Sequence, residues 1–381
     1  MKSYIYIFFI LCMMLSSCRG DIVVYPSETE QHGDTINGNL LGFYLLNEGN
    51  MGSNKATLDF YDFSTASYTR NIYSERNPSV PLSLGDVGND LQIYGNRLYA
   101  VINVSNKVEV MTADSAKRIG QIDIPNCRYL CFDGQYGYIT SYAGPVQIGK
   151  EHAQLGYVAR FDTATLEITA TCLVGYQPDG LAIANGKLYV ANSGGYMAPD
   201  YENTLSVIDL TTFREEKRIV AGINLQYVKA DQYGSLWVSS RGDHYNVSPR
   251  LYCIDTAQDT VSCEIDIPVS NFTISGDSLY FFGEQFNWET LQNELTFGLI
   301  DITTHSMLAE NFITDQTALQ KPYGIAVNPV TKDVYITDAK DYVTPGTLYC
   351  ISPEGKLRWQ VRTGDIPAHF AFLFAQTAEK H

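Results

Sequence analysis

The sequence predicts an all-β protein, a seven-bladed β-propeller, and two observations carry this prediction. Seven segments align in one register: a strand, a turn, a second strand that begins with an aromatic residue, a loop, and a third strand that in most copies ends with Asp. Equivalent positions of the first strands recur every 39 to 52 residues. Because a four-stranded propeller blade occupies about 40 to 50 residues, each segment matches one blade.

The second strands are the most regular part of the repeat. Six of the seven begin with Tyr and the other begins with Trp; they are Tyr44–Asn47, Tyr99–Asn103, Tyr138–Ser141, Tyr189–Asn192, Trp237–Ser240, Tyr280–Gly283 and Tyr335–Asp338. The third strands end at Asp62, Asp162, Asp209, Asp255 and Asp301, with Ser352 as a close variant. Thr or Ser follows most of these Asp residues, which favours a tight turn because short polar side chains bond to the nearby backbone.

The first strands indicate how the ring closes. Their equivalent positions are Leu91, Leu130, Leu181, Val228, Thr273, Ile325 and Phe370. The earliest second strand, Tyr44–Asn47, has no first strand before it, and the last first strand, His369–Leu373, has no second strand after it. We therefore expect the C-terminal strand to be the innermost strand of the blade that the N-terminal part begins, since an open ring would leave unpaired strand edges.

Residues 1–17 are typical of a lipoprotein signal peptide. Lys2 gives a positive start, residues 4–15 are apolar, and Leu15-Ser16-Ser17-Cys18 is similar to the lipobox of bacterial lipoproteins. The apolar run is shorter than the roughly 20 residues that span a bilayer. We expect cleavage before Cys18 and acylation of its thiol with fatty acids such as palmitate, because two or more chains anchor a protein stably.

A tether and a single folded domain are expected after the leader. Residues 18–39 contain few large apolar side chains apart from Ile22 to Tyr25, so they are predicted to form a lipid-anchored flexible tether. Residues 40–376 are predicted to form the propeller. The implied location is the outer membrane, with the protein lipid-anchored and exposed on the cell surface.

The composition excludes several classes of partner and bond. The chain has 42 acidic and 26 basic residues, a formal net charge of −16, which disfavours nucleic acid and anionic lipid surfaces. Six cysteines remain after Cys12 and Cys18, and their spacing does not resemble a zinc site. Buried free thiols are expected, while a cross-strand disulfide between Cys253 and Cys263 stays open.

Sequence motifs for catalysis are absent. The chain lacks a G-x-S-x-G elbow, a P-loop, a dinucleotide-binding fingerprint and an HExxH pair. Its histidines are scattered over different repeats, and no acidic run has the spacing of a calcium loop. We therefore expect a protein that is not an enzyme and that holds no metal and no resident cofactor.

The loops after the second strands, together with the links into the first strands, converge on one face of a propeller. Several of them carry large aromatic side chains, which loops normally avoid. The residues predicted to bind a ligand there are Tyr142, Asn192, Tyr196, Tyr201, Tyr227, Arg241, His244, Tyr245, Phe286, Trp288, Tyr323 and Tyr342. Tyr129, Tyr227, Phe272 and Tyr323 recur at one repeat position, so packing between blades is an equal alternative for these four.

A resemblance to known propellers rests on specific residues. Tyr189-Val190-Ala191-Asn192 with the downstream run 203–209, Asn-Thr-Leu-Ser-Val-Ile-Asp, resembles the YVTN-type repeat of extracytoplasmic seven-bladed propellers, from about Leu41 to Phe374. The lipobox, the polar tether and the Tyr-rich propeller together resemble the surface lipoproteins of gut anaerobes that capture cobalamin (vitamin B12). This resemblance implies binding of cobalamin or related corrinoids as transported ligands and their transfer to a TonB-dependent outer-membrane transporter.

Two other functions are compatible with the same sequence. One is a non-catalytic propeller scaffold that binds a protein partner or a neutral glycan. The other is a propeller lactonase or lyase with a site at the axis, where scattered residues such as His152 and Asp338 could meet. Titration of the protein with cyanocobalamin separates corrinoid capture from both.

The lipobox generates the first testable prediction. Replacement of Cys18 by Ala removes the thiol that would be acylated, so the variant should lose metabolic labelling by fatty acid and leave the membrane fraction. Labelling and fractionation of cells that express each form make the comparison. Persistent labelling of Cys18→Ala would contradict the assignment.

Overall fold

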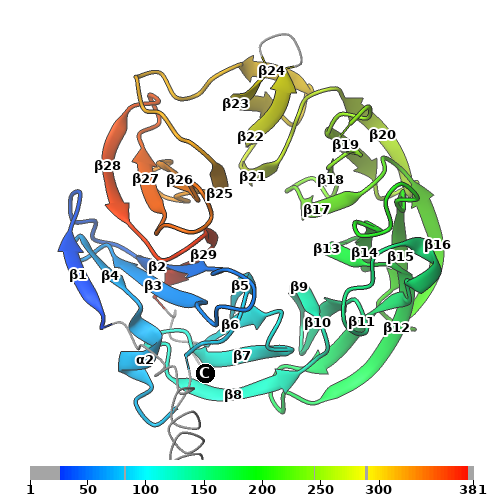
Figure 1. Ribbon diagram of the computed structural model, residues 1–381, viewed down its shortest axis with the longest axis horizontal. Coiled ribbons are helices and arrows are strands. Elements are labelled where there is room, and N and C mark those ends of the chain that lie inside the picture. Colours follow the sequence, from blue (N-terminus) through cyan, green and yellow to red (C-terminus); the bar gives the residue numbers. More distant parts are fainter. Residues whose placement is uncertain (1–25, 81–82, 244, 288–290, 376–381) are drawn as a thin grey trace, which may run out of the picture.

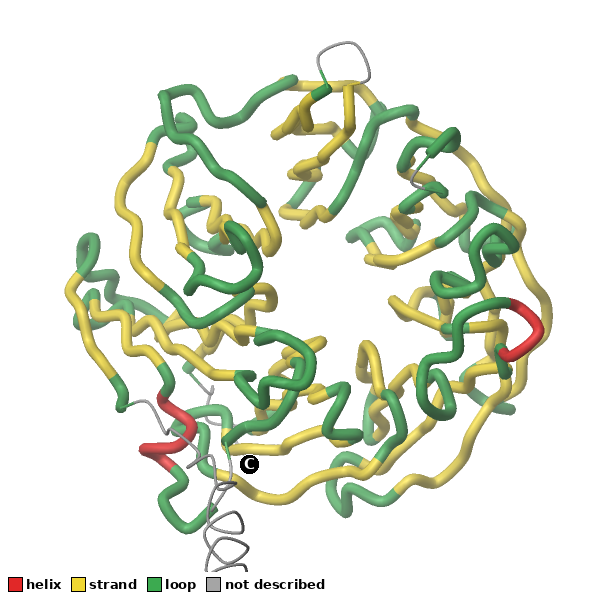
Figure 2. Tube along the Cα trace, viewed as in Figure 1, coloured by secondary structure: helices red, strands yellow, loops and turns green. Residues whose placement is uncertain are grey.

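Seven β-sheets stand around a central axis in the computed structural model, which describes residues 26–80, 83–243, 245–287 and 291–375 (Figure 1). Figure 2 shows that strands dominate the described chain and that helix is confined to α2 (Ile72–Arg76) and the short 3-10 helix η1 (Lys150–His152). The predicted seven-bladed propeller is thus confirmed. Within the described ranges, no helix has the length and hydropathy that a membrane crossing requires.

Blades 2 to 7 each contain four antiparallel strands in chain order from the axis outward. Blades 2 to 4 consist of β5 (Gly88–Tyr94), β6 (Arg97–Ile102), β7 (Lys107–Thr112) and β8 (Arg118–Asp123); β9 (Cys127–Asp133), β10 (Tyr136–Ser141), β11 (Leu155–Asp162) and β12 (Ile168–Tyr176); and β13 (Pro178–Ala184), β14 (Lys187–Asn192), β15 (Thr204–Asp209) and β16 (Arg214–Val220). Blades 5 to 7 consist of β17 (Leu225–Ala230), β18 (Leu236–Ser240), β19 (Arg250–Asp255) and β20 (Thr260–Ile265); β21 (Asn271–Ser275), β22 (Ser278–Asn287), β23 (Gln292–Asp301) and β24 (Ser306–Ala309); and β25 (Pro322–Val327), β26 (Val334–Asp338), β27 (Thr347–Ile351) and β28 (Leu357–Arg362).

Blade 1 combines both ends of the chain. From the axis outward it contains β29 (Pro367–Phe374), β2 (Leu40–Asn47), β3 (Thr57–Asp62), β4 (Ser67–Arg70) and β1 (Glu28–Gln31). The C-terminal strand β29 pairs antiparallel with β2, with Phe370 opposite Leu45. Phe43 packs against Phe370, Phe372 and, from blade 7, Tyr335, so this junction is a cluster of aromatic rings. The innermost position of blade 1 is therefore filled from the other end of the chain.

The N-terminal boundary of the fold differs from the prediction. Part of the predicted flexible tether forms β1, which pairs with β4 as a fifth strand, and Ile36 packs against the core of blade 1. Arg70 of β4 forms ion pairs with Glu28 and Glu30 of β1. The side chains of β1 are all exposed. Backbone hydrogen bonds and ion pairs hold this strand. Its sequence therefore lacks the apolar residues by which a strand is usually predicted.

The aromatic residue that begins each second strand explains how the blades hold together. Tyr99, Tyr138, Tyr189, Trp237 and Tyr335 are buried, each in a hydrophobic cluster that contains residues of two neighbouring blades. The polar ends of two of these rings find partners: the Tyr189 hydroxyl donates to Asp259 at 2.6 Å, and Trp237 Nε1 donates to Asp231 at 3.0 Å. These rings fill the space between the sheets, although the buried Tyr99 hydroxyl has no hydrogen-bond partner in the described chain.

Two smaller predictions are also confirmed. Asp162 Oδ1 accepts hydrogen bonds from the backbone N–H groups of Ala164 and Thr165 at 2.8 and 2.9 Å, which is the expected tight turn after a third strand. All six cysteines in the described chain are free thiols; four are buried as expected, and Cys131 and Cys263 are half-buried. Cys253 and Cys263 lie opposite each other on β19 and β20 without a disulfide.

The innermost strands enclose an axial channel of about 410 Å³. Its lining is mostly aliphatic and aromatic, with Asp90, Lys229 and His369 as charged or titratable groups. The Lys229 amine lies over the rings of Tyr227 and Phe272, at 5.9 and 5.2 Å from their centroids. Burial lowers the pKa of Lys229 to about 8 against the opposing effect of Asp90.

Closure of blade 1 generates a prediction about folding. Deletion of residues from His369 onward removes most of β29 and the rings of Phe370 and Phe372 from the junction. Burial of one Phe contributes about 1.5 to 3 kcal/mol, and a domain has a typical stability of about 5 to 15 kcal/mol. The truncated protein should show no cooperative thermal transition by circular dichroism. Truncation after Ala375 is the matched control, and a truncation at His369 that melts like this control would contradict the closure.

The buried amine generates a prediction about pH. The pKa of an unfolded Lys is about 10.4, so the lower pKa in the folded state means that the charged amine destabilises the fold below about pH 8. This cost fades as the pH rises toward 10.4. Lys229→Met should raise the free energy of unfolding more at pH 7 than at pH 10, by about 2 kcal/mol. Denaturant unfolding at both values, with the exposed Lys332→Met as control, measures this difference, and an equal gain at both pH values would contradict it.

Candidate functional site

A cavity larger than the axial channel lies on the face where second-strand loops and inter-blade links meet, which we call the upper face. It has a volume of about 780 Å³ and spans blades 5 to 7. Its lining combines aromatic, amide, hydroxyl and charged side chains; it comprises Gln226, Tyr227, Arg241, Tyr245, Asn246, Val247, Ser248, Pro249, Val269, Ser270, Phe282, Glu284, Gln285, Phe286, Leu295, Lys321, Pro322, Tyr323 and Tyr342. We call this volume the face cavity.

One wall of the face cavity is the hairpin of β22 and β23. Both strands have ten residues, longer than the strands of the other blades, so the hairpin extends beyond the sheet and carries Phe286, which is 40% exposed. The base of this wall crosses the link from blade 5 very closely. A Cβ atom at Gly283 would lie 1.3 Å from the carbonyl oxygen of Pro268. Glycine at this position is what allows the hairpin to stand beside the link.

A tight turn after β18 forms a second wall. The Asp243 carboxylate accepts hydrogen bonds from the backbone N–H groups of Tyr245, Asn246 and Val247 at 2.8 to 2.9 Å. These bonds lower the pKa of Asp243. The turn presents Tyr245 with 77% of its surface exposed. A single carboxylate thus orders the loop and leaves an aromatic ring free at the rim of the face cavity.

The floor is made of two half-buried tyrosines. The Tyr323 hydroxyl donates to Glu48 of blade 1 at 2.8 Å, and the other oxygen of Glu48 lies 3.1 Å from His369 Nε2. The ring of Tyr227 meets that of Tyr129 edge to face at 5.8 Å, and Tyr227 lines both the face cavity and the axial channel. Burial raises the pKa of Tyr227 and Tyr323 well above the ordinary value, so both hydroxyls stay protonated.

An ion pair crosses the cavity between blades 6 and 7. Lys321 binds Glu284, and its amine also lies 5.8 Å from the centroid of the Tyr342 ring. Burial alone would lower the pKa of Lys321, but its bond with Glu284 outweighs that effect and the pKa is raised. The pair is charged and nearly neutral in sum, so this side of the cavity adds hydrogen-bonding groups without net charge.

A second group of charges lies at the inner rim over blades 3 to 5. The buried carboxylate of Asp179 contacts Arg128 Nε at 3.1 Å and Arg241 Nη2 at 2.8 Å. It also accepts from the Tyr142 hydroxyl at 2.7 Å. Burial alone would raise the pKa of Asp179, but the two arginines outweigh that effect and lower it. The carboxylate is therefore ionised and shared by two cations, which leaves one net positive charge in this group.

The structure brings six of the twelve predicted ligand-binding residues together in the face cavity: Tyr227, Arg241, Tyr245, Phe286, Tyr323 and Tyr342. Tyr196 and Tyr201 lie on the same face over blade 4 but do not line the cavity. His244 and Trp288 lie outside the described residues. The predicted residues that meet in the face cavity therefore come from blades 5 and 7, with one residue from blade 6.

Two predicted residues are buried in the scaffold and not on the cavity wall. The Asn192 amide is buried, donates to Thr204 and Ser206 at 3.0 and 2.9 Å, and accepts from the Gly175 N–H at 3.0 Å. Tyr142 is buried against Asp179. Their polar atoms serve the fold because the strand ends need internal partners.

The four aromatic residues that share one repeat position differ in their surroundings, and inter-blade packing fully buries only one of them. Phe272 is fully buried in the cluster between blades 5 and 6. Tyr227 and Tyr323 line the face cavity, and Tyr129 lines the axial channel. Sequence reasoning missed Glu48, Asp179, Arg128, Glu284 and Lys321. They come from different blades, and nothing in their spacing along the chain relates them.

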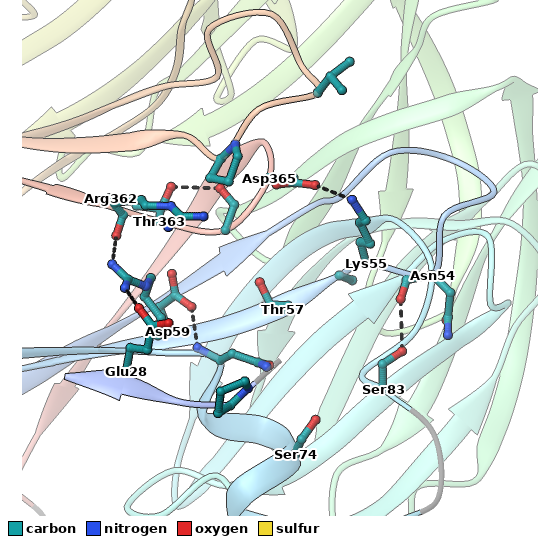
Figure 3. A pocket seen from close by; sticks show the side chains of 17 residues that line it. Glu28, Asn54, Lys55, Thr57, Asp59, Ser74, Ser83, Arg362, Thr363 and Asp365 are labelled. Atoms are coloured by element: carbon teal, nitrogen blue, oxygen red, sulfur yellow. Dashed lines mark hydrogen bonds and ion pairs between the residues drawn. The ribbon is translucent and has the colours of Figure 1, made fainter. Parts of the chain in front are cut away.

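A smaller pocket of about 310 Å³ lies between blades 7 and 1 (Figure 3). Its polar groups bond to one another: Lys55 pairs with Asp365 at 3.2 Å, and the Ser83 hydroxyl donates to the carbonyl oxygen of Asn54 at 3.2 Å. Asp59 accepts from the Asn71 N–H. The face cavity is the stronger candidate because its aromatic rings are exposed. Among residues with described positions, no group of three or more His, Cys, Asp or Glu has the geometry of a metal site.

Comparisons with known proteins agree with this fold. A search of the curated proteins finds no relative of this sequence. Among solved structures, the chain is similar to hydrazine synthase of Kuenenia stuttgartiensis, at 17% identity and a TM-score of 0.54, over 69% of this chain and 76% of that one. It is also similar to a quinonprotein alcohol dehydrogenase-like protein of Bacteroides thetaiotaomicron, at 14% identity and a TM-score of 0.57, over 89% and 79% of the two chains.

A candidate 6-phosphogluconolactonase of Bacteroides uniformis is similar at 10% identity and a TM-score of 0.59, over 87% of this chain and 99% of that one. At these identities the likeness shows the propeller fold alone. A family profile covers most of the sequence, from residue 41 to residue 351. The chain therefore belongs to the family described as a domain of unknown function, DUF5074.

Proposed function

We propose that this protein is a lipid-anchored surface propeller that binds cobalamin or a related corrinoid and passes it to a TonB-dependent outer-membrane transporter. The observation that carries the proposal is the face cavity, where exposed aromatic rings alternate with amide and hydroxyl groups. The fold supplies a rigid frame for such a site, and chemistry is not part of the proposed role.

The shape and chemistry of the face cavity suit a large, amide-edged plate. Its volume of about 780 Å³ falls within the roughly 300 to 1,000 Å³ of small-molecule sites. Tyr245 of blade 5 and Phe286 of blade 6 offer exposed aromatic platforms in the lining of the cavity. Gln226, Asn246 and Gln285 offer donors and acceptors that match the amides at the edge of a corrin ring. A corrinoid would therefore find both kinds of contact in one cavity.

Charge supports the same class of ligand. The whole chain has a formal net charge of −16, which repels strongly acidic ligands. Within the face cavity, Lys321 and Glu284 compensate each other. A ligand with little net charge therefore meets no repulsion there, and acidic polysaccharides are disfavoured.

The expected anchor would hold the propeller close to the membrane. Cys18 lies eight residues before Pro26, the first described residue, and the next element, β1, is the outermost strand of blade 1 (Figure 1). Such a segment reaches at most ~28 Å when extended. The face cavity spans blades 5 to 7, and blade 7 is the neighbour of blade 1 in the ring. An anchored protein could thus offer its ligand to a transporter in the same membrane.

The aromatic walls generate a prediction about binding. The double variant Tyr245→Ala and Phe286→Ala should bind cyanocobalamin at least about tenfold more weakly, about 1.4 kcal/mol, because a few aromatic anchors dominate most interfaces. Its melting temperature should stay close to that of the wild type, since exposed side chains contribute little to the core. Calorimetric titration of the purified propeller measures the affinity, and a thermal melt measures the stability.

Two matched controls test whether the effect belongs to the cavity. Tyr196→Ala removes a ring that is 45% exposed on the same face outside the cavity, and Tyr233→Ala removes a ring that is 60% exposed on a turn of the opposite face. Both should bind like the wild type. A flat titration of folded wild-type protein would overturn corrinoid capture and leave a neutral glycan or a protein partner as the ligand of the same rings.

A further inference from the structure

The group of Asp179, Arg128 and Arg241 has one more positive charge than is needed to compensate its buried carboxylate. One buried carboxylate faces two guanidinium groups, each bound to a different oxygen. Burial of an ionised carboxylate requires one partner of opposite charge. The second arginine is therefore not explained by charge compensation, in a chain whose formal net charge is −16.

The two guanidinium groups are fixed by their surroundings. Arg128 stacks over the Tyr142 ring at 4.9 Å, and Arg241 Nη1 lies 3.4 Å from Asn224 Oδ1. The two terminal nitrogens of Arg128 have no hydrogen-bond acceptor among the residues with described positions. The same is true of Nε of Arg241. The side chains of Arg128 and Arg241 keep 16% and 27% of their surface exposed. N–H groups held in place and open to a ligand are what a bound anion needs.

The group lies at the edge of the face cavity and extends away from it. Arg241 lines the cavity beside Tyr227 and Gln226. Arg128 reaches the same carboxylate from blade 3, so it draws part of the negative charge of Asp179 away from Arg241. The pKa of Arg128 is raised well above its usual value, because Tyr142 and Asp179 outweigh the effect of burial. Both arginines therefore stay charged at any physiological pH.

We propose that Arg241, supported by Arg128 through Asp179, is an anion subsite of the face cavity that binds the phosphate group of the ligand. The paired N–H donors of a guanidinium group match the oxygens of a phosphate diester or monoester. The negative charge of the phosphate would compensate the net positive charge of this group. This inference rests on the proposed function, in which the ligand is a corrinoid whose nucleotide loop contains one phosphodiester. The aromatic walls would hold the ring, and Arg241 would fix its orientation.

A pair of ligands that differ in the phosphate tests the subsite. Cyanocobalamin contains the phosphate-bearing nucleotide loop, and dicyanocobinamide contains the same corrin without it. Arg241→Gln should weaken binding of cyanocobalamin at least about tenfold and change binding of dicyanocobinamide less than about twofold. Arg218→Gln, on outer strand β16 in an ion pair with Glu215, makes the same charge change away from the cavity and should leave both affinities unchanged.

An equal loss of affinity for the two corrinoids in Arg241→Gln would overturn the subsite, because it would show a general effect on the shape of the cavity. Unchanged affinity for both would overturn it as well. Arg241→Lys keeps the charge without the fork and should recover part of the affinity for cyanocobalamin only.

A second measurement does not depend on corrinoid binding. Inorganic phosphate should raise the melting temperature of the wild type and of Arg218→Gln more than that of Arg241→Gln, at matched ionic strength, because a bound anion stabilises the folded state. An equal rise in all three proteins would overturn the subsite. If the wild type binds neither corrinoid but shows this difference, the proposed ligand is wrong and the anion subsite stands.

Discussion

Packing of one aromatic ring between each pair of neighbouring sheets is the constraint on which this structure depends. Tyr189 and Trp237, for example, are fully buried between blades 4 and 5 and between blades 5 and 6. Each sheet therefore buries its faces against two neighbours, and no sheet can be removed without exposing both. Such a ring has to close, and β29 closes it by pairing with β2 inside the aromatic cluster around Phe43.

Because the core lies between the blades, the loops of the upper face are free to vary. The hairpin of β22 and β23 extends, and the turn around Asp243 is ordered by its own hydrogen bonds. Polar contacts then join these loops across blades, as Tyr323 does with Glu48 and Arg241 with Asp179. The face cavity is thus a product of loop lengths and inter-blade contacts, supported by a scaffold that does not depend on its shape.

The cavity has two chemically different parts. Over blades 5 to 7 it offers aromatic rings and a compensated ion pair, and at the inner rim it offers Arg241 with an excess of positive charge. A ligand with a broad apolar body and one anionic group would contact both parts. The similar propellers include a hydrazine synthase and an alcohol dehydrogenase-like protein, so the fold does not assign the chemistry of this site.

The sequence alone determined the number of blades, the strand order and the exposed rings of Tyr245 and Phe286, because a repeat and large apolar residues in loops are local patterns. It did not reveal β1, which is held by backbone bonds and by Arg70, and it could not separate the buried amide of Asn192 from a ligand-binding one. Only the tertiary structure decided these points and the meeting of Arg128, Asp179 and Arg241. Burial and pairing across three blades depend on distances in space, which spacing along the chain does not contain.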